Sequence, residues 1–243
     1  MPARHALVTG ASRGIGRAIA EELAARGHRV VINYHTRQDM AEETARAIQE
    51  RGGTCSLLAF DVTDVPAATA AVKRLVKEQG TVDIVVHNAG VTRDVLFAAM
   101  KHESWDRVIR TALDGWFAVT RPCLHGMLKQ DWGRVIAVGS VAGQVGNPGQ
   151  ANYAAAKAGL VGAMRSLSAE VCRRGILVNA VAPGFIDTDM LRALEADRAE
   201  LEARIPMGRV GRPEEVARVV AFLAGDEISY VSGQVIGVNG GMI

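Results

Sequence analysis

The sequence has few cysteines and no long apolar run. Only three of the 243 residues are cysteines, Cys55, Cys123 and Cys172, an odd number without CxxC spacing. This pattern argues against both a disulfide framework and a structural zinc site. No stretch of 18 consecutive apolar residues occurs, so we expect neither a membrane-spanning helix nor a signal peptide. These absences favour a protein of the reducing cytoplasm without a metal site.

The chain also lacks an excess of charge of either sign. Lys and Arg total 28 and Asp and Glu total 26, which leaves a formal net charge of +2. A protein that tracks nucleic-acid phosphates needs a more basic surface. Aromatic residues make up only 5%, but 49% of the residues are hydrophobic and no linker-like stretch divides the chain. We therefore predict one folded domain over residues 1–243 that binds neither nucleic acid nor a membrane.

Short apolar runs rich in β-branched residues recur along the chain and predict seven β-strands. The segments between them show helical periodicity; Ile15, Ile19 and Leu23, for example, are spaced four residues apart. This alternation predicts right-handed βαβ crossovers and a doubly wound, Rossmann-type α/β fold, with a parallel sheet covered on both faces. The predicted strands cover residues 5–9, 29–34, 54–60, 82–87, 134–138, 176–182 and 234–238.

One segment between the sixth predicted strand and the helix that starts near Pro213 differs from the rest. Residues 189–205 read as a charged helix with one apolar stripe. We interpret this segment, about 188–206, as a mobile lid over the functional site. The stripe consists of Met190, Leu194, Leu201 and Ile205.

A glycine-rich turn, TGASRGIG over residues 9–16, connects the first predicted strand to the first predicted helix. Glycines permit positive φ and a close approach of the backbone to a pyrophosphate, while the N–H groups of the helix start face the anion. The GxxxGxG spacing is a variant of the GxGxxG fingerprint. Its position at a strand-to-helix junction predicts a dinucleotide site. The turn residues expected to bind the dinucleotide are Gly10, Ser12, Arg13, Gly14, Ile15 and Gly16.

The charges around the second predicted strand favour a cofactor with a 2′-phosphate. Sites for NAD carry an acidic residue about 20 residues beyond the glycine turn, yet no acid occurs between Glu22 and Asp39. Arg13 in the turn and Arg37 just after the strand, which ends near Asn33, can instead form charge-assisted hydrogen bonds with a phosphate. We predict NADP(H) as the cofactor. The alternative for Arg37 is an exposed charge at the start of a helix.

Tyr153 is the only tyrosine with a lysine four residues later, Lys157, and this spacing places both side chains on one helix face. A free phenol has a pKa of about 10. We expect the neighbouring ammonium and the positive charge of the cofactor to lower the pKa of Tyr153, which then acts as a general acid. Ser140, at the end of the fifth predicted strand, can hydrogen-bond a carbonyl oxygen as negative charge develops on it. We predict these three residues to be catalytic.

The motifs and their order along the chain resemble those of the short-chain dehydrogenase/reductase family, in particular the members that reduce 3-oxoacyl groups on acyl carrier protein. The resemblance covers essentially the whole chain. The resemblance implies that Asp61 and Val62 lie at the adenine. It also implies that Lys157 bonds the nicotinamide ribose and that Ile186 and Thr188 meet the carboxamide. The remaining cofactor contacts that it implies are Asn33, Asn88, Ala89, Gly90, Tyr153, Pro183 and Gly184, and the motif at 238–241 (VNGG) completes the likeness.

The resemblance implies NADPH-dependent reduction of a 3-oxoacyl thioester, carried on acyl carrier protein, by a cytoplasmic homotetramer. Two long predicted helices, about 104–130 and 151–174, carry apolar residues on more than one side, which fits contacts with another subunit. The residues leave two alternatives open. One is an enzyme for another alcohol, sugar or steroid, and the other is a weakly active NADP-binding subunit of a mixed oligomer.

Three positions depart from the pattern of the family. Its usual Asn-Asn-Ala-Gly begins here with His87, which ends a buried strand, so we expect a packed, hydrogen-bonded histidine instead of an acid or base. Ala112 stands where the family commonly has the asparagine of its proton relay; a backbone carbonyl could serve instead if the helix is locally distorted. Asp131 replaces a residue that is often basic. Arg173 and Arg174 are candidates for contact with an acidic carrier near the mouth of the site, or for favourable charges at a helix end.

Overall fold

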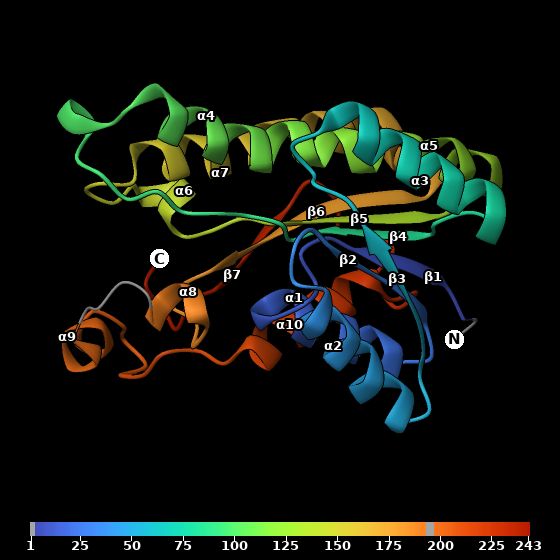
Figure 1. The fold of residues 1–243 in the computed structure, drawn as a ribbon, viewed down its shortest axis with the longest axis horizontal. Coiled ribbons are helices and arrows are strands. Elements are labelled where there is room, and N and C mark those ends of the chain that lie inside the picture. The colour runs from blue at the N-terminus through green and yellow to red at the C-terminus, as the bar shows by residue number, and fades with distance from the viewer. Residues whose placement is uncertain (1–2, 193–196) are drawn as a thin grey trace.

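One parallel sheet with the strand order β3-β2-β1-β4-β5-β6-β7 forms the centre of the computed structural model, which describes residues 3–192 and 197–243 (Figure 1). Within these ranges each strand lies within two residues of its predicted position. The doubly wound α/β fold is therefore confirmed. The strands are β1 (His5–Val8), β2 (Arg29–Tyr34), β3 (Thr54–Ala59), β4 (Ile84–His87), β5 (Gly133–Val138), β6 (Ile176–Pro183) and β7 (Val235–Val238).

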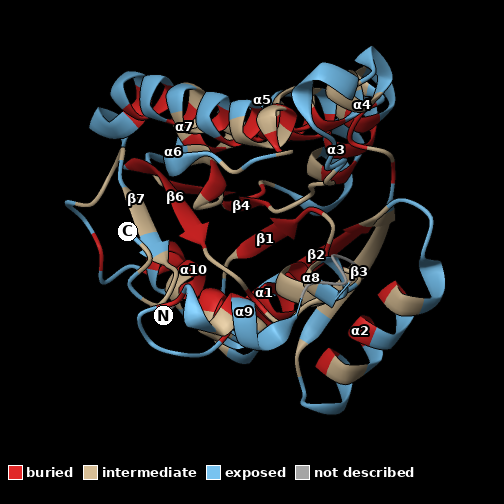
Figure 2. Cartoon of the chain, turned by 90° about the vertical axis from the view of Figure 1, so that its left-hand side faces the viewer, coloured by how far each residue is buried: buried red, intermediate tan, exposed pale blue. Residues whose placement is uncertain are grey.

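Helices cover both faces of the sheet, as Figure 1 shows. On one face lie α1 (Gly14–Ala25), α2 (Gln38–Glu50) and α10 (Pro213–Ala224); on the other lie α3 (Val65–Gln79), α5 (Gly115–Gln130) and α7 (Ala151–Val171). Alternate residues of β1 enter different apolar cores: Ala6 and Val8 pack with the first layer and Leu7 with the second. Figure 2 shows the result: the central strands are buried between helices whose outer faces are exposed, and the edge strands β3 and β7 are only partly buried.

The strand order places the functional site at one edge of the sheet. The chain leaves β1 toward β2 on one side, whereas β4 lies on the other side of β1. At such a reversal the connections after the two strands diverge and leave a crevice at their carboxyl ends, where ligands of this fold class bind. β5 and β6, which continue the sheet, are buried along their whole length.

The long helix predicted over about 104–130 contains a local distortion. It consists of α4 (His102–Ile109), a π-helical turn η2 (Arg110–Asp114) and α5. A π-helical turn of this kind inserts an extra residue into a helix and is frequent at functional sites. Ala112 lies inside this turn, so the local distortion on which a backbone relay at this position depends is present. The short helix η1 (Phe97–Ala99) precedes α4.

The lid segment is not the single helix that its apolar stripe predicts. It contains two short helices, α8 (Asp189–Arg192) and α9 (Arg198–Ala203). The side chain of Asp197 accepts a hydrogen bond from Ala199 N and begins α9 anew, with an extended backbone at Asp197 itself. Of the stripe, Leu201 and Ile205 are buried and Met190 is exposed, while Leu194 lies outside the described residues. No helix in residues 3–192 and 197–243 has the length and apolar character that crossing a bilayer requires.

Candidate active site

A cavity of about 790 Å³ opens at the carboxyl edge of the sheet. Every residue predicted to bind the cofactor or to act in catalysis lines it. The structure therefore brings together residues that are up to 178 positions apart in the chain, from Gly10 to Thr188. These residues are Gly10, Ser12, Arg13, Gly14, Ile15, Gly16, Asn33, Arg37, Asp61, Val62, Asn88, Ala89, Gly90, Ser140, Tyr153, Lys157, Pro183, Gly184, Ile186 and Thr188.

The glycine turn at the centre of the cavity is tightly packed against the rest of the site. Gly10 and Gly14 have φ of +60° and +55°, a conformation that favours glycine. A Cβ atom on Gly16 would lie 2.2 Å from the Gly10 carbonyl oxygen. Asn88 Nδ2 donates to the carbonyl oxygens of Thr9 and Gly10, at 3.0 Å each. Only glycine at position 16 permits this arrangement.

Asn33 supports the turn from the other side. Its Oδ1 accepts the Gly10 N–H at 3.1 Å, and its Nδ2 donates to the carbonyl oxygens of Leu58 and Phe60, at 3.2 Å each. The side chain is buried, so its polar atoms are engaged by the protein. We predicted Asn33 as a contact of the cofactor. In the structure its side chain holds the glycine turn in position.

The residues present fit a dinucleotide phosphate. Helix α1 begins at Gly14, and the side chain of its N-cap residue, Arg13, forms no capping hydrogen bond, so the first N–H groups of this 12-residue helix remain available to an anion. A glycine-lined approach to these groups is what a pyrophosphate needs, because any side chain on the turn would hold it away from the backbone.

Arg13 and Arg37 both line the cavity, and each faces a carboxylate. The Arg13 guanidinium lies 3.8 Å from Asp189, and both side chains are more than half exposed. Arg37 forms two hydrogen bonds with Asp39, at 3.0 and 2.7 Å, and this arginine lowers the pKa of the Asp39 carboxyl to about 2. Arg37 is also the N-cap of α2, as the alternative interpretation expected. Exposed pairs of this kind are weak and can exchange for a phosphate.

Tyr153 and Lys157 lie one turn apart on α7 and face Ser140, which follows β5. The Lys157 ammonium is buried and donates to the carbonyl oxygen of Val138 at 2.7 Å. It lies 5.6 Å from the centroid of the Tyr153 ring. A Cβ on Gly90 would lie 3.4 Å from the same ammonium, so this glycine leaves room for it. The three predicted catalytic residues thus share one wall of the cavity.

In the protein chain alone the pKa of Tyr153 shifts upward, and the decrease expected with the positive charge of the cofactor stays a prediction. Burial raises the pKa of this phenol above its ordinary value of 10.0; a hydrogen bond with Ser140 lowers it and the Asp94 carboxylate raises it. Burial also lowers the pKa of Lys157 to about 8. Tyr153 is therefore a protonated phenol near neutral pH, which is the form a general acid requires.

His87 is completely buried and neutral. Burial and, second, the charge of Lys157 lower its pKa to about 3. The Thr9 hydroxyl accepts the N–H groups of Asn88 and Ala89, so its own proton is directed to His87 Nδ1, 3.3 Å away. The expected packed histidine is confirmed, although Nε2 has no hydrogen-bond partner among the described residues.

The structure also shows where Ala112 lies, and where the two arginines lie that are candidates for contact with a carrier, Arg173 and Arg174. The methyl group of Ala112 packs with Val108 and Ala156, and Tyr153 packs against this cluster. Arg174 is hydrogen-bonded to Asp131 and precedes β6, at the edge where the strands begin. The cavity lies at the opposite edge. Arg173 and Arg174 therefore do not lie near the mouth of the cavity in their own chain, and our expectation that they do is wrong.

Several residues of the cavity escaped the sequence patterns. Gln150 Nε2 donates to Asp94 at 2.7 Å, and Gln150 Oε1 accepts from Asn147 at 3.2 Å. Helical spacing was a usable signal for Gln150, because it precedes Tyr153 by three residues. Phe185 stands between the predicted contacts Gly184 and Ile186, and Arg204 lies inside the predicted lid segment. Met242 gave no such signal, because only the tertiary fold brings it to the cavity.

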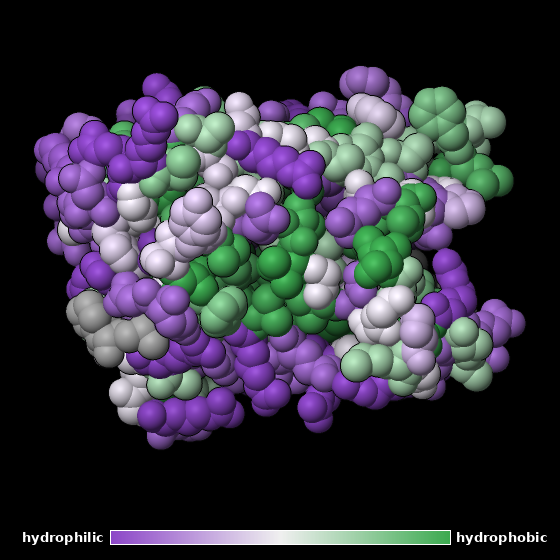
Figure 3. Space-filling view, turned by 180° about the vertical axis from the view of Figure 1, so that it is seen from behind, coloured by the Kyte–Doolittle hydropathy of each residue, from purple (hydrophilic) through white to green (hydrophobic). Residues whose placement is uncertain are grey.

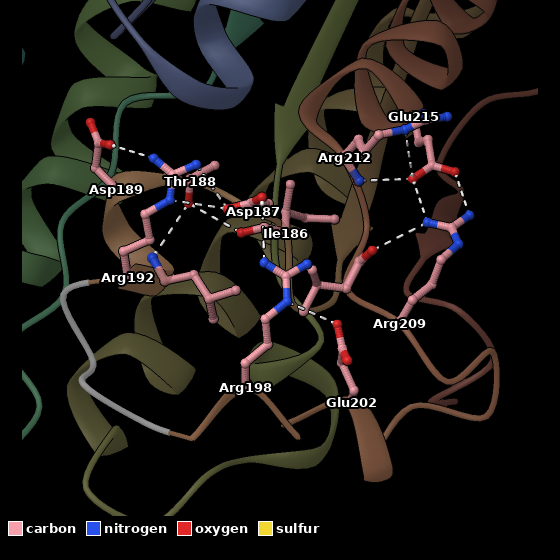
Figure 4. Close-up of polar contacts among 12 residues, drawn as sticks. Ile186, Asp187, Thr188, Asp189, Arg192, Arg198, Glu202, Arg209, Arg212 and Glu215 are labelled. Carbon is pink, nitrogen blue, oxygen red and sulfur yellow. Dashed lines mark hydrogen bonds and ion pairs between the residues drawn. The ribbon is translucent and has the colours of Figure 1, made fainter. Parts of the chain in front are cut away.

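Polar contacts fix both ends of the lid segment, as Figure 4 shows. Arg192 pairs with Asp187 at 3.0 Å, and Arg198 lies 3.7 Å from the same carboxylate. The backbone of Asp187 donates to Gly211 at 2.8 Å. Beyond the segment, Glu215 pairs with Arg209 at 2.7 Å. Thr188, at the start of the segment, therefore keeps a defined position beside the glycine turn, with its Cγ2 3.4 Å from where a Gly14 Cβ would lie.

Comparison with known proteins agrees with this site. The family described as enoyl-(acyl carrier protein) reductase matches residues 10–243. A 3-oxoacyl-(acyl-carrier-protein) reductase FabG of Escherichia coli (strain K12) is 51% identical over 239 residues, which cover 98% of this chain and 96% of the relative. Proteins of the same name from Pseudomonas aeruginosa and Staphylococcus aureus are 50% and 45% identical, over 98% of this chain and 96% and 98% of theirs. The chain belongs to the short-chain dehydrogenase/reductase family.

Proposed function

We propose that this protein reduces the keto group of a 3-oxoacyl thioester, carried on acyl carrier protein, to the 3-hydroxyacyl product with NADPH. The observation that carries the proposal is the wall formed by Ser140, Tyr153 and Lys157 beside the glycine turn, in one cavity of about 790 Å³. The names of the relatives, 3-oxoacyl-(acyl-carrier-protein) reductases, support the substrate class.

The residues of the cavity would hold NADP(H) along its length. The N-terminus of α1 and the glycine turn suit the pyrophosphate, and Arg13 and Arg37 suit the 2′-phosphate. We assign Asp61 and Val62 to the adenine, Lys157 to the nicotinamide ribose, and Ile186 and Thr188 to the carboxamide. When bound, the reduced cofactor supplies a hydride to the carbonyl carbon. The other predicted contacts are Gly10, Ser12, Gly14, Ile15, Gly16, Asn33, Asn88, Ala89, Gly90, Tyr153, Pro183 and Gly184.

The chain itself orients the substrate and supplies the proton. The hydroxyl groups of Ser140 and Tyr153 both donate to the carbonyl oxygen and stabilise the negative charge that develops on it. Tyr153 then gives its proton to this oxygen. The buried Lys157 ammonium favours the phenolate that remains, because opposite charges attract more strongly where water is excluded. Ala112 offers no side-chain amide to a proton relay, so a backbone carbonyl of the π-helical turn takes that part.

Two O–H donors directed at one oxygen favour a ketone over the carbon–carbon double bond named in the description of the matching family. Two such donors would serve the carbonyl group of another alcohol, sugar or steroid substrate equally well. The sequence identity of about 50% with the named 3-oxoacyl reductases favours the thioester. The complete catalytic set favours an active enzyme over a weakly active subunit of a mixed oligomer, the alternative that Ala112 leaves open.

We further propose a single domain with a mobile lid over about 188–206, a homotetramer and a cytoplasmic location. The exposed Phe117 on α5, on the outer surface of the helical layer that also contains α7, supports a contact with another subunit there. The low cysteine content supports a reducing compartment.

The test is turnover of NADPH by the purified protein with 3-oxobutanoyl, 2-butenoyl and simple ketone substrates, each thioester on the same carrier. We expect the 3-oxobutanoyl thioester to be reduced with the highest kcat/KM. Preference for the 2-butenoyl thioester or for a simple ketone would contradict the proposed substrate. Tight NADPH binding without turnover of any of these, together with co-purification of a homologous chain, would favour the mixed oligomer.

A further inference from the structure

The arginines that line the cavity differ in their partners. Three of them face carboxylates: Arg13 faces Asp189, Arg37 faces Asp39, and Arg107 lies 3.6 Å from Asp61. The other two, Arg93 and Arg204, form no ion pair with any carboxylate in residues 3–192 and 197–243. Both are exposed to solvent at the cavity. A guanidinium without a counter-ion at a ligand site is the group that a bound anion can pair with most favourably.

Arg93 and Arg204 belong to the catalytic half of the cavity. The carbonyl oxygen of Arg93 accepts a hydrogen bond at 3.0 Å from Asn152, the neighbour of Tyr153 on α7. Arg204, at the C-terminal end of α9, stacks over the ring of Phe185, 5.4 Å from its centroid. Phe185 follows β6, next to Ser140 after β5. The three paired arginines instead gather near the ends of β1, β2 and β3, on the side assigned to the adenosine phosphate.

A backbone hydrogen bond holds the segment around Arg93 in place, which defines the position from which its side chain extends. Val95 N donates to Gly149 O at 2.8 Å, which ties this segment to the chain that leads into α7. One guanidinium nitrogen of Arg93 donates to the carbonyl oxygen of Thr92 at 2.9 Å. The remaining N–H groups have no acceptor among the described residues and are available to an anion.

Exposed apolar side chains occur in the cavity wall and in the chain just after Arg93. Val145 and Met190, which line the cavity, are 61% and 42% exposed, and Leu96 and Phe97, close to Arg93 in the chain, are 69% and 71% exposed. Seen from behind, Figure 3 shows apolar side chains at the corner where η1 lies, separated by a notch from the part that contains α8 and α9. An uncharged, flexible chain that ends in an anion would complement such a mouth.

We infer that Arg204 and Arg93 form a phosphate site at the mouth of the cavity, which binds the phosphate of the 4′-phosphopantetheine arm that presents the acyl thioester. This inference rests on the proposed function and extends it. In such a substrate the reacting keto group lies at one end of a neutral arm and the phosphate at the other end. Arginine recognises phosphate through parallel charge-assisted hydrogen bonds. The same phosphate occurs on acyl carrier protein and on free 4′-phosphopantetheine.

The test uses two substrates that differ only in the phosphate, 3-oxobutanoyl-pantetheine and 3-oxobutanoyl-4′-phosphopantetheine. We expect the wild-type protein to have the higher kcat/KM for the phosphorylated arm, mainly through a lower KM. Arg204→Gln should reduce this preference about fivefold, as expected for one exposed ion pair, and Arg204→Lys should retain part of it. Arg93→Gln should act in the same direction. High salt should reduce the preference of the wild-type protein as well.

Arg46→Gln is the matched control, because Arg46 is an exposed arginine of α2 outside the cavity; the preference should persist in it. Equal rates on both arms in the wild-type protein, or an unchanged preference in Arg204→Gln, would overturn the inference while leaving the reductase activity demonstrated. A loss in Arg204→Gln that appears only with the carrier-borne thioester would also overturn it, because the arginine would then contact the carrier itself. Failure of both substrates and of the carrier-borne 3-oxobutanoyl thioester would instead refute the proposed function.

Discussion

Lys157 is a buried cation whose charge is sensitive to pH. Burial lowers its pKa from 10.5 to about 8, whereas the pKa of Tyr153 is raised above 10.0 and the phenol stays protonated. We therefore predict that kcat/KM falls above about pH 8, as Lys157 loses its proton, and not above pH 10. The measurement is a pH profile with NADPH and a 3-oxobutanoyl thioester. Lys129→Met, which removes an exposed lysine, should keep the same profile.

Stability should change in the opposite direction over this range. Between about pH 8 and 10.5 the unfolded chain binds the Lys157 proton more tightly than the folded chain, so the free energy of unfolding contributed by this group rises with pH. A loss of activity above pH 8 without a decrease in stability would thus identify the titration of the site. A profile that stays flat to pH 10 would contradict the assignment.

At the scale of single residues, the sequence predicted which residues form the site better than it predicted their pKa shifts. The spacing of Tyr153 and Lys157 was enough to place both on one helix face, and the position of Ser140 at the end of a predicted strand made it a candidate for the same site. The spacing could not predict that Lys157 donates to Val138 or that Asp94 is near Tyr153, because these contacts join residues from different elements. In the protein chain alone, the direction of the pKa shift of Tyr153 depends on these contacts and on burial, which sequence spacing does not reveal; the decrease expected with the bound cofactor stays a prediction.

Among the elements, the glycine turn tolerates substitution least. A Cβ on Gly16 would lie 2.2 Å from the Gly10 carbonyl oxygen and 2.5 Å from Asn88 Nδ2, and the backbone oxygen cannot move without displacing the turn. We predict that Gly16→Ala weakens NADPH binding at least about tenfold, which corresponds to about 1.4 kcal/mol. Titration of the intrinsic fluorescence with NADPH measures it.

Gly162→Ala provides the control for this prediction. Gly162 lies within α7, and a Cβ there would meet no atom within 4 Å. Alanine favours a helix over glycine by up to about 1 kcal/mol, so this variant should bind NADPH as the wild-type protein does and be equally or more stable. Equal binding by Gly16→Ala and Gly162→Ala would show that the turn is not the phosphate site.

Sequence patterns predicted the regular elements closely and their irregularities poorly. β5 and β6 are buried along their length, and such continuous apolar runs are distinctive. The position of η2 came only from the family resemblance, since one inserted residue hardly alters the apolar periodicity. The break before α9 was missed, because the stripe of Leu201 and Ile205 outweighed the capping signal of Asp197.

At the scale of the whole molecule, the cofactor should stabilise the fold according to its affinity. A nucleotide that binds only the folded chain raises stability by RT ln(1 + [L]/Kd). Because Arg13 and Arg37 suit a 2′-phosphate, we predict that NADP⁺ raises Tm more than NAD⁺ at the same concentration. A tenfold difference in affinity, about 1.4 kcal/mol, corresponds to about 3–6 °C for a domain of this size. The combined Arg13→Ala and Arg37→Ala variant should lose the difference, whereas an equal or larger shift with NAD⁺ would contradict the cofactor assignment.

The account as a whole depends on the Tyr153 hydroxyl as the proton donor to a substrate carbonyl, and Tyr153→Phe tests this most directly because it removes one oxygen atom and keeps the ring. The measurement is kcat for reduction of a 3-oxobutanoyl thioester, together with the Kd of NADPH, in the variant and in the wild-type protein. We predict that kcat falls by about 10²–10⁴-fold while the Kd changes by less than about twofold. A variant that retains most of its kcat would contradict the central role of Tyr153.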